Sequence, residues 1–326
     1  MTRHILITGA AGFVAQQLTS ALLAAAPDYH LTLTDIVSPS SPDPSRTTSI
    51  QADLTDPAEV ASLLSSQAPW HAIYALHGVM SSTSESHLEL GYKVNLDAHR
   101  HIYDYLLAHP SPSPKVKVIF TSSCAIYGPP STAGPTRTFT EHTLPLPQTS
   151  YGTQKLMIEA LLTDYTRRGI LDARIARLPS VVVRAGAPTG AASSWMSGIL
   201  REPLNGQPSI LPVDKNLDVW LCSPGTVVHN LILLKDIPEE KFQKYLSRAV
   251  NLPGITVGVK EMLDVLEEVG GKEARGLVRE EVDEKTEKIC LGWPERFDTS
   301  RARELGLRED VGLLEGVRAY KASLGK

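Results

Sequence analysis

The sequence contains only three cysteines, no long apolar run and no excess of positive charge. Cys124, Cys222 and Cys290 are too scattered for a zinc site or a disulfide framework, so we expect no metal and a reducing location, the cytoplasm. No segment reaches the roughly 18 consecutive apolar residues that a membrane-spanning helix needs, and no signal-peptide pattern precedes the apolar run that begins at His4. The net charge of -4 provides no basic surface for nucleic acid. We therefore expect neither a membrane nor a nucleic-acid partner.

What the sequence does contain is a regular alternation of strand and helix patterns before Arg184. Strands are predicted at His4–Thr8, Leu31–Thr34, Ser49–Ala52, Ala72–Leu76, Val116–Thr121 and Ala173–Arg177, and helices at 13–23, Pro57–Ser65, Leu88–His109 and Tyr151–Arg168. This order predicts right-handed βαβ crossovers and an α/β fold, a doubly wound parallel sheet of Rossmann type. We expect a large domain at 1–180, with a returning segment at about 215–255, and a smaller C-terminal domain at 181–214 and 256–326.

A glycine-containing turn joins the first predicted strand to the first predicted helix. In the run TGAAGFVA, Gly9 can take strained dihedral angles, Gly12 lets backbone amides approach a pyrophosphate, and Ala15 is small enough for helix and strand to pack closely. Asp35 ends the second predicted strand, where a carboxylate would bind the adenosine ribose and repel a 2′-phosphate. No arginine or lysine follows within the next ten residues, so the pattern predicts NAD rather than NADP. The alternatives are a flexible turn and an exposed strand-end aspartate.

Tyr151 and Lys155 form a Y-x-x-x-K pattern at the start of a predicted helix, which places both side chains on one face. An ammonium there would stabilise tyrosinate and lower the pKa of the phenol, which could then exchange a proton near neutral pH. Upstream, a buried strand is predicted to end in hydroxyl residues at the edge where open α/β sheets bind ligands. Ser123 would donate a hydrogen bond to a reacting oxygen, whereas Ser122 would be a structural hydroxyl. The alternative is an ordinary tyrosine–lysine pair on a helix surface.

As a set, these motifs resemble the extended short-chain dehydrogenase/reductase family, also called the NAD-dependent epimerase/dehydratase family. The resemblance is carried by TGAAGFVA, Asp35, Asp53-Leu54-Thr55-Asp56, Val94-Asn95-Leu96, FTSSCAIYG and YGTQK, and it spans the predicted Rossmann domain. It implies NAD as cofactor and Ser123, Tyr151 and Lys155 as the catalytic trio. The residues that it implies for cofactor binding are Gly9, Ala11, Gly12, Phe13, Val14, Asp35, Ile36, Asp53, Leu54, Leu76, His77, Gly78, Asn95, Tyr151, Lys155, Pro179 and Val181. One departure is Ala15, where the family usually has glycine, although the fingerprint itself accepts alanine.

Further stretches resemble the D-erythronate dehydrogenase group of that family, which oxidises a short sugar acid at carbon 2. They are LHGVMSSTSE, LGYKVNLD, RLPSVVVRAG, AASSWMSGILREPLNGQ and WPERFDTSRARELGL. That group tends to carry a glycine and a glutamate shortly after the fourth strand, where this sequence has Met80–Thr83 before Glu85.

A carboxylate substrate needs a multi-donor cation, and the arginine fork matches its two oxygens. Each candidate arginine could equally form a surface or interdomain ion pair. The candidate substrate-binding residues are Ser81, Ser82, Ser123, Cys124, Tyr151, Arg184, Ser193 and Arg201, with Thr189 as a further hydroxyl. We expect His77 to be neutral and packed, and Trp195, Trp220 and Trp293 to pack in the core or a lid.

Three functions are compatible with this pattern. The leading hypothesis is an NAD-dependent dehydrogenase acting on the 2-hydroxy group of a small sugar acid. The second is a nucleotide-sugar epimerase or dehydratase that keeps NAD tightly bound. The third, an NAD-sensing regulator of a protein partner, is disfavoured because a sensor would not need the whole trio. The resemblance also implies a homodimer formed through the helices at 88–109 and 151–168.

Overall fold

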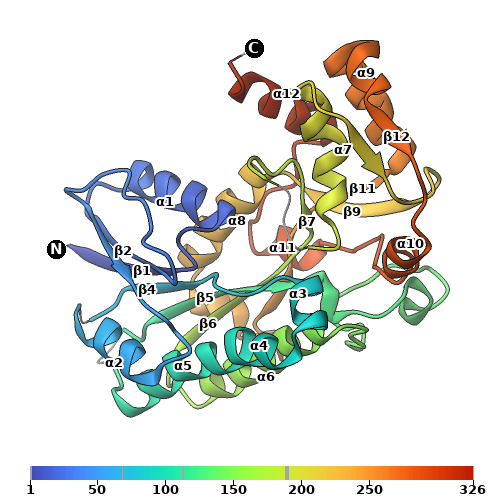
Figure 1. The fold of residues 1–326 in the computed structure, drawn as a ribbon. Helices are drawn as coiled ribbons and strands as arrows, with labels where there is room; N and C mark the ends of the chain where they lie inside the picture. Colours follow the sequence, from blue (N-terminus) through green and yellow to red (C-terminus); the bar gives the residue numbers. More distant parts are fainter. Residues whose placement is uncertain (1, 68, 112–113, 188–190, 326) are drawn as a thin grey trace.

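The computed structural model describes residues 2–67, 69–111, 114–187 and 191–325. Its larger part is built on a seven-stranded parallel sheet of order β10-β6-β5-β4-β1-β2-β3 (Figure 1). The strands are β1 Arg3–Thr8, β2 Tyr29–Asp35, β3 Thr47–Gln51, β4 Ala72–Ala75, β5 Lys117–Ser123, β6 Asp172–Leu178 and β10 Ala249–Asn251. The chain runs outward from β1 to β3 and then crosses back to β4, so the carboxyl ends of β1 and β4 enclose the crevice where such sheets bind ligands.

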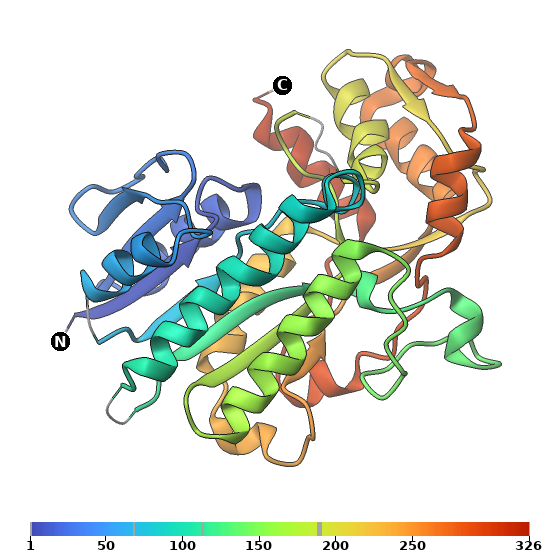
Figure 2. The same cartoon turned by 60° about the horizontal axis from the view of Figure 1, so that its bottom comes forward.

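Helices cover both faces of this sheet, and the expected doubly wound α/β fold is confirmed (Figures 1 and 2). One face carries α1 Phe13–Ala25 and α8 Pro224–Asp236, and the other carries α2 Pro57–Ser65, α4 Leu88–Tyr92, α5 Ala98–Ala108 and α6 Ser150–Arg167. The central strands read as continuous apolar runs because they are buried on both faces; Ile5, Leu6 and Ile7 of β1 have no exposed surface. Local signals fix the helix starts: Asp56 caps α2 and Thr149 caps α6 through hydrogen bonds from backbone N–H groups.

The helix expected at 88–109 is interrupted by a wider turn. Between α4 and α5, residues Lys93–Asp97 form a π-helical segment, η1. Asn95 lies within it and is fully buried. Such bulges occur often at functional sites, because the extra residue redirects a side chain. Here it turns an amide toward the end of β4.

The smaller part of the molecule has a core of its own. A three-stranded sheet of β7 Ser180–Val181, β9 Asp218–Cys222 and β11 Ile255–Gly258 lies beside a two-stranded sheet of β8 Ser209–Leu211 and β12 Val278–Glu280. The helices of this part are α7 Ser194–Leu204, α9 Val259–Gly276, α10 Glu284–Leu291 and α12 Leu313–Ser323. Short segments elsewhere are α3 Ser81–Ser86, η2 Cys124–Ile126, η3 Pro130–Ala133, η4 Glu239–Phe242 and α11 Ser300–Glu304.

Strand pairing and packing differ from the expected domain limits in two places. The returning segment was expected from about 215, but β9 pairs with β7 and β11 in the smaller sheet, so the return begins with α8. Residues after 256 were expected in the smaller domain, but Ala302, Leu305 and Leu307 pack into the core formed with α1 and α8. Their apolar side chains are buried only because the chain returns to the large sheet there. In the described part of the chain, every helix is too short or too polar to cross a membrane.

Candidate active site

A cavity of about 1220 Å³ runs along the carboxyl ends of β1, β4 and β5 and reaches the smaller part of the molecule. Of the residues expected at the cofactor and substrate sites, all the described ones line this cavity except Ala11, Asn95 and Arg201. Thr189 lies outside the described residues. Segments from both parts of the chain therefore contribute to one site.

The glycine turn fits a bound pyrophosphate. Gly9 has a φ of 67°, and a Cβ atom there would lie 2.7 Å from the Cα atom of His77, so only glycine lets the β1 turn lie so close to the end of β4. A Cβ atom on Gly12 would lie 3.0 Å from the Gly9 carbonyl oxygen. Gly12 caps α1 without a side-chain hydrogen bond, which leaves N–H groups at the helix start for an anion.

The part of the cavity beside the ends of β2 and β3 is lined by the two acidic residues that the sequence indicated, Asp35 and Asp53. One oxygen of Asp35 accepts the Ala11 N–H at 3.0 Å, which ties the strand-end carboxylate to the glycine turn. Ile36 follows and is largely exposed. Asp53 accepts hydrogen bonds from the N–H and hydroxyl of Thr55, so its side chain shapes a turn while the residue lines the cavity.

His77 packs as expected, in neutral form. Its Nδ1 atom shares a 2.7 Å hydrogen bond with the Thr8 hydroxyl, and its ring stacks on His99 with centroids 3.7 Å apart. Burial lowers the pKa of His77 to about 3, with a further contribution from the positive charge of Lys155. An imidazole with this pKa is uncharged at neutral pH, so it serves as a wall of the site.

Asn95 holds three segments together behind the cavity. Its side-chain oxygen accepts the Val79 N–H at 2.8 Å, and its amide group donates to Val79, to Ser84 and to Gln154. Gln154 lies between Tyr151 and Lys155 on α6. The π-helical turn thus connects the end of β4 and α3 to the helix that carries the tyrosine–lysine pair.

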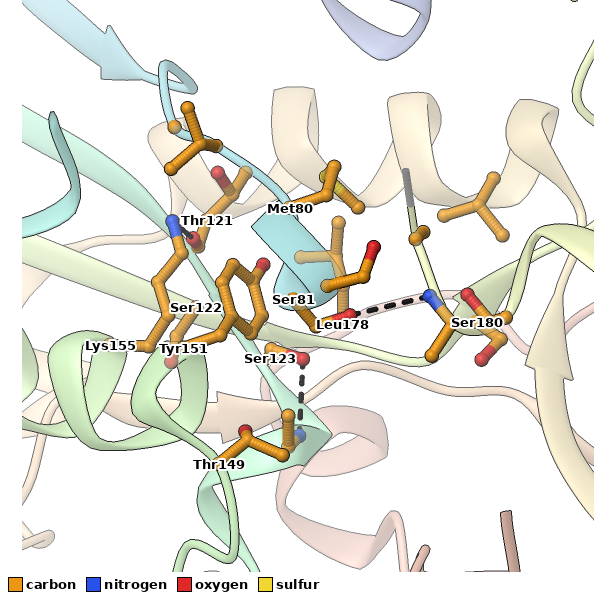
Figure 3. Close-up of a pocket in the computed structure, with 18 of the residues that line it drawn as sticks. Met80, Ser81, Thr121, Ser122, Ser123, Thr149, Tyr151, Lys155, Leu178 and Ser180 are labelled. Atoms are coloured by element: carbon orange, nitrogen blue, oxygen red, sulfur yellow. Dashed lines mark hydrogen bonds between the residues drawn. The ribbon is translucent and has the colours of Figure 1, made fainter. Parts of the chain in front are cut away.

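Tyr151, Lys155 and Ser123 come together at the end of β5 (Figure 3). The Lys155 Nζ atom donates to the Thr121 carbonyl oxygen at 2.9 Å and lies 5.7 Å from the centre of the Tyr151 ring. Burial lowers the pKa of Lys155 to about 8, while the carboxylate of Glu159 opposes this shift.

The pKa of Tyr151 differs from the sequence-based expectation. Burial raises the pKa of Tyr151 to about 12, although the nearby Ser123 hydroxyl and the positive charge of Arg184 act to lower it. The expectation of a lowered Tyr151 pKa was wrong, because removing the phenolate from water costs more than the Ser123 hydroxyl and the Arg184 charge return. Arg184 is the cation that acts on the phenol.

Ser122 and Cys124 flank Ser123 and have other surroundings. The Ser122 hydroxyl donates to Glu159 at 2.5 Å, in agreement with a structural role. Cys124 lines the cavity as a buried residue, and burial raises the pKa of its thiol, which is therefore protonated at neutral pH.

The two candidate arginines have different positions. Arg184 lines the cavity together with Ser81, Ser82 and Ser193. Arg201 does not; it donates to the Arg184 carbonyl oxygen at 2.9 Å and pairs with Glu202 at 2.5 Å. Its guanidinium supports the segment that carries Arg184, which corrects its expected place in the substrate pocket.

The outer wall of the cavity was missed by sequence reasoning. It includes Asp218 and Trp220 of β9 and Lys288 and Trp293 near α10. Trp220 also packs on Phe297, with ring centroids 5.0 Å apart, so it has the packing role expected of it as well. No local pattern marks these residues, because the smaller part of the molecule brings them to the cavity through long-range contacts.

These features define a dinucleotide-dependent oxidoreductase, and the chain belongs to the NAD dependent epimerase/dehydratase family, whose profile matches residues 5–236. It is an NAD-dependent enzyme that acts on a CH–OH group. The sequence is 38% identical to a D-erythronate dehydrogenase of Haemophilus influenzae, over 97% of this chain and 98% of that one, and 36% identical to one of Cupriavidus necator, over 99% of both. The crystal structure described as a nucleoside-diphosphate-sugar epimerase from Agrobacterium tumefaciens superposes with a TM-score of 0.90 and 35% identity, over 99% of this chain and 95% of the other. An L-threonine dehydrogenase from Cupriavidus necator, at 23% identity and a TM-score of 0.85 over 98% and 99% of the two chains, shares the fold.

Proposed function

We propose that this enzyme oxidises the 2-hydroxy group of a small sugar acid resembling D-erythronate. The main support for this proposal is the position of Arg184. This residue lines the same cavity as Tyr151, and its positive charge acts to lower the pKa of the Tyr151 phenol. Among the described residues, no carboxylate lies within 4.0 Å of its guanidinium. A substrate carboxylate would supply the missing counter-charge next to the reacting hydroxyl. The two D-erythronate dehydrogenases to which the chain is similar support this choice.

In this proposal the tyrosinate form of Tyr151 takes the proton of the substrate hydroxyl, and Ser123 donates a hydrogen bond to the same oxygen. Lys155, held by the Thr121 carbonyl oxygen, places a positive charge near the Tyr151 ring and would donate a hydrogen bond to the nicotinamide ribose. When bound, NAD accepts the hydride from the substrate carbon. Pro179 and Val181 line the cavity where they would border the nicotinamide, and the Gly9–Gly12 turn and Asp35 would hold the other half of the cofactor.

Another part of the cavity wall carries serine hydroxyls that suit a polyhydroxy acid. Ser81, Ser82 and Ser193 come from two segments and line the cavity. Ser81 accepts a long hydrogen bond of 3.4 Å from the Ala192 N–H, which joins these segments across the site. Hydroxyl groups placed in this way favour a polyhydroxy chain over an alkyl chain, because they can exchange hydrogen bonds with substrate hydroxyls and gain none from an alkyl chain.

A nucleotide-sugar epimerase is the second candidate, favoured by the description of the Agrobacterium tumefaciens structure. The same trio would serve it, but NAD would stay bound through oxidation and reduction. A panel of four- and five-carbon aldonic acids with NAD, followed by the absorbance of NADH, separates the two. Free NADH accumulating with one acid supports the dehydrogenase; retained NAD and turnover of a nucleotide sugar would support the epimerase.

We also propose that two copies pair through α4, α5 and α6 and that the enzyme works in the cytoplasm. Leu88, Leu90, Leu107 and Met157 are 42–53% exposed on these helices, and a second copy that packs on the helices would cover these apolar side chains. All three cysteines are free and buried, which suits a reducing compartment.

A further inference from the structure

A buried ion pair joins helix α6, which carries Tyr151 and Lys155, to strand β6. Glu159 follows Lys155 by four residues on α6, and its side chain is 5% exposed. Arg177 of β6 binds this carboxylate through Nη2 at 2.6 Å and through Nε at 3.0 Å. The other side of Arg177 donates to the Tyr127 hydroxyl at 2.5 Å. None of these groups has a part in the proposed proton or hydride transfer.

Three side chains of helix α6 face three consecutive residues at the end of β5. Lys155 donates to the carbonyl oxygen of Thr121 at 2.9 Å, Glu159 accepts the hydroxyl of Ser122 at 2.5 Å, and the Ser123 hydroxyl acts to lower the pKa of Tyr151. Because residues four apart share one helix face, the tyrosine, the lysine and the glutamate form a single row. Figure 3 shows the two labelled helix residues beside the three labelled strand residues.

Glu159 is also the main opposite charge that acts on Lys155. From β4 and α5, the nearby titratable groups are His77 and His99, both neutral because burial lowers their pKa values. From α6, Tyr151 is neutral and Glu159 raises the pKa of Lys155 against the effect of burial. From β6, Arg177 is bound to Glu159 through Nη2.

We propose that Glu159 is a positioning residue with two effects: it holds Ser123 in register with Tyr151 through Ser122, and it supplies the counter-charge behind the Lys155 ammonium. Arg177 holds the carboxylate of Glu159 in place through its Nη2 and Nε atoms. This inference rests on the proposed function for the role of Ser123. Its electrostatic part concerns Lys155 alone and is independent of the substrate.

The electrostatic part is tested by NADH binding as a function of pH, measured by fluorescence titration of the purified protein. In the wild type, NADH affinity should weaken as pH rises through about 8, where the Lys155 ammonium loses its proton. In Glu159→Gln the inflection should move down by about one pH unit. In Ser122→Ala, where the ion pair is intact, it should not move. An unchanged inflection in folded Glu159→Gln, as judged by its thermal melt, would overturn the electrostatic part.

The positioning part is tested by turnover. Ser122→Ala removes only the hydroxyl that Glu159 holds, so kcat should fall about tenfold while NADH affinity and KM stay within twofold. A wild-type kcat in Ser122→Ala would overturn the positioning part. This test does not need Glu159→Gln, so it can be made even if that variant does not fold. If the wild type oxidises no sugar acid, the proposed function fails, and the NADH titration still decides the charge relation between Glu159 and Lys155.

Discussion

Replacement of Arg184 tests the proposed substrate class most directly. Arg184→Met keeps the length of the side chain and removes its charge and donors. A carboxylate bound by this guanidinium would be partly shielded from water, and losing one partner of such a pair costs about 3 kcal/mol, or roughly 150-fold in kcat/KM. Arg184→Lys keeps the charge but loses the fork, so we expect a loss of about tenfold.

The assay is the initial rate of NADH formation with the best aldonic acid and with its uncharged amide. Replacing Arg184 should lower kcat/KM strongly for the acid and little for the amide, because only the acid has the carboxylate. Arg201→Met is the matched control: Arg201 touches the Arg184 carbonyl and does not line the cavity, so its loss should be smaller than that of Arg184→Met. The reasoning is refuted if kcat/KM of Arg184→Met for the acid stays within threefold of the wild-type value, or if kcat/KM falls by the same factor for the acid and for the amide.

Four further outcomes follow from the site. Tyr151→Phe should lower kcat by about 10³-fold with NADH affinity unchanged in a fluorescence titration; equal activity would remove the tyrosine from the mechanism. With burial raising the Tyr151 pKa to about 12, the phenolate fraction grows as pH rises, so kcat/KM for oxidation at saturating NAD should climb from pH 7 to 10, and a flat profile would contradict a tyrosinate base. Gly9→Ala should lose NADH binding and lower the melting temperature, since its Cβ atom would lie 2.7 Å from the His77 backbone; a wild-type melt would mean that the turn can shift. Leu107→Asp, on the exposed face of α5, should convert a dimer to a monomer in light scattering, and an unchanged mass would place the interface elsewhere.

The sequence predicted the strands, the glycine turn and the trio because each has a local pattern. Short continuous apolar runs locate β1, β4 and β5 within two residues, and the spacing of Tyr151 and Lys155 alone puts them on one helix face. The ends of parallel strands meet at one edge, so their hydroxyl residues could be assigned to the site before any contact was known.

Long-range contacts account for what the sequence could not predict. Arg184 and Arg201 look alike in the chain, and only the fold shows that one supports the backbone of the other. The π-helical turn at Asn95 depends on hydrogen bonds to Val79, 16 residues earlier, and to Gln154, 59 residues later. The pKa of Tyr151 depends on burial by segments that no motif describes.

The return of residues 300–307 to the large sheet limits how this enzyme could be divided or recombined. The family profile ends at 236, yet Ala302, Leu305 and Leu307 fill the core beside α1 and α8. A fragment cut after the last strand of the large sheet would leave that apolar surface bare. A chimera that exchanges the smaller part of the molecule for that of a relative would therefore have to keep the native segment around α11. The segments before and after α11 would have to be exchanged separately.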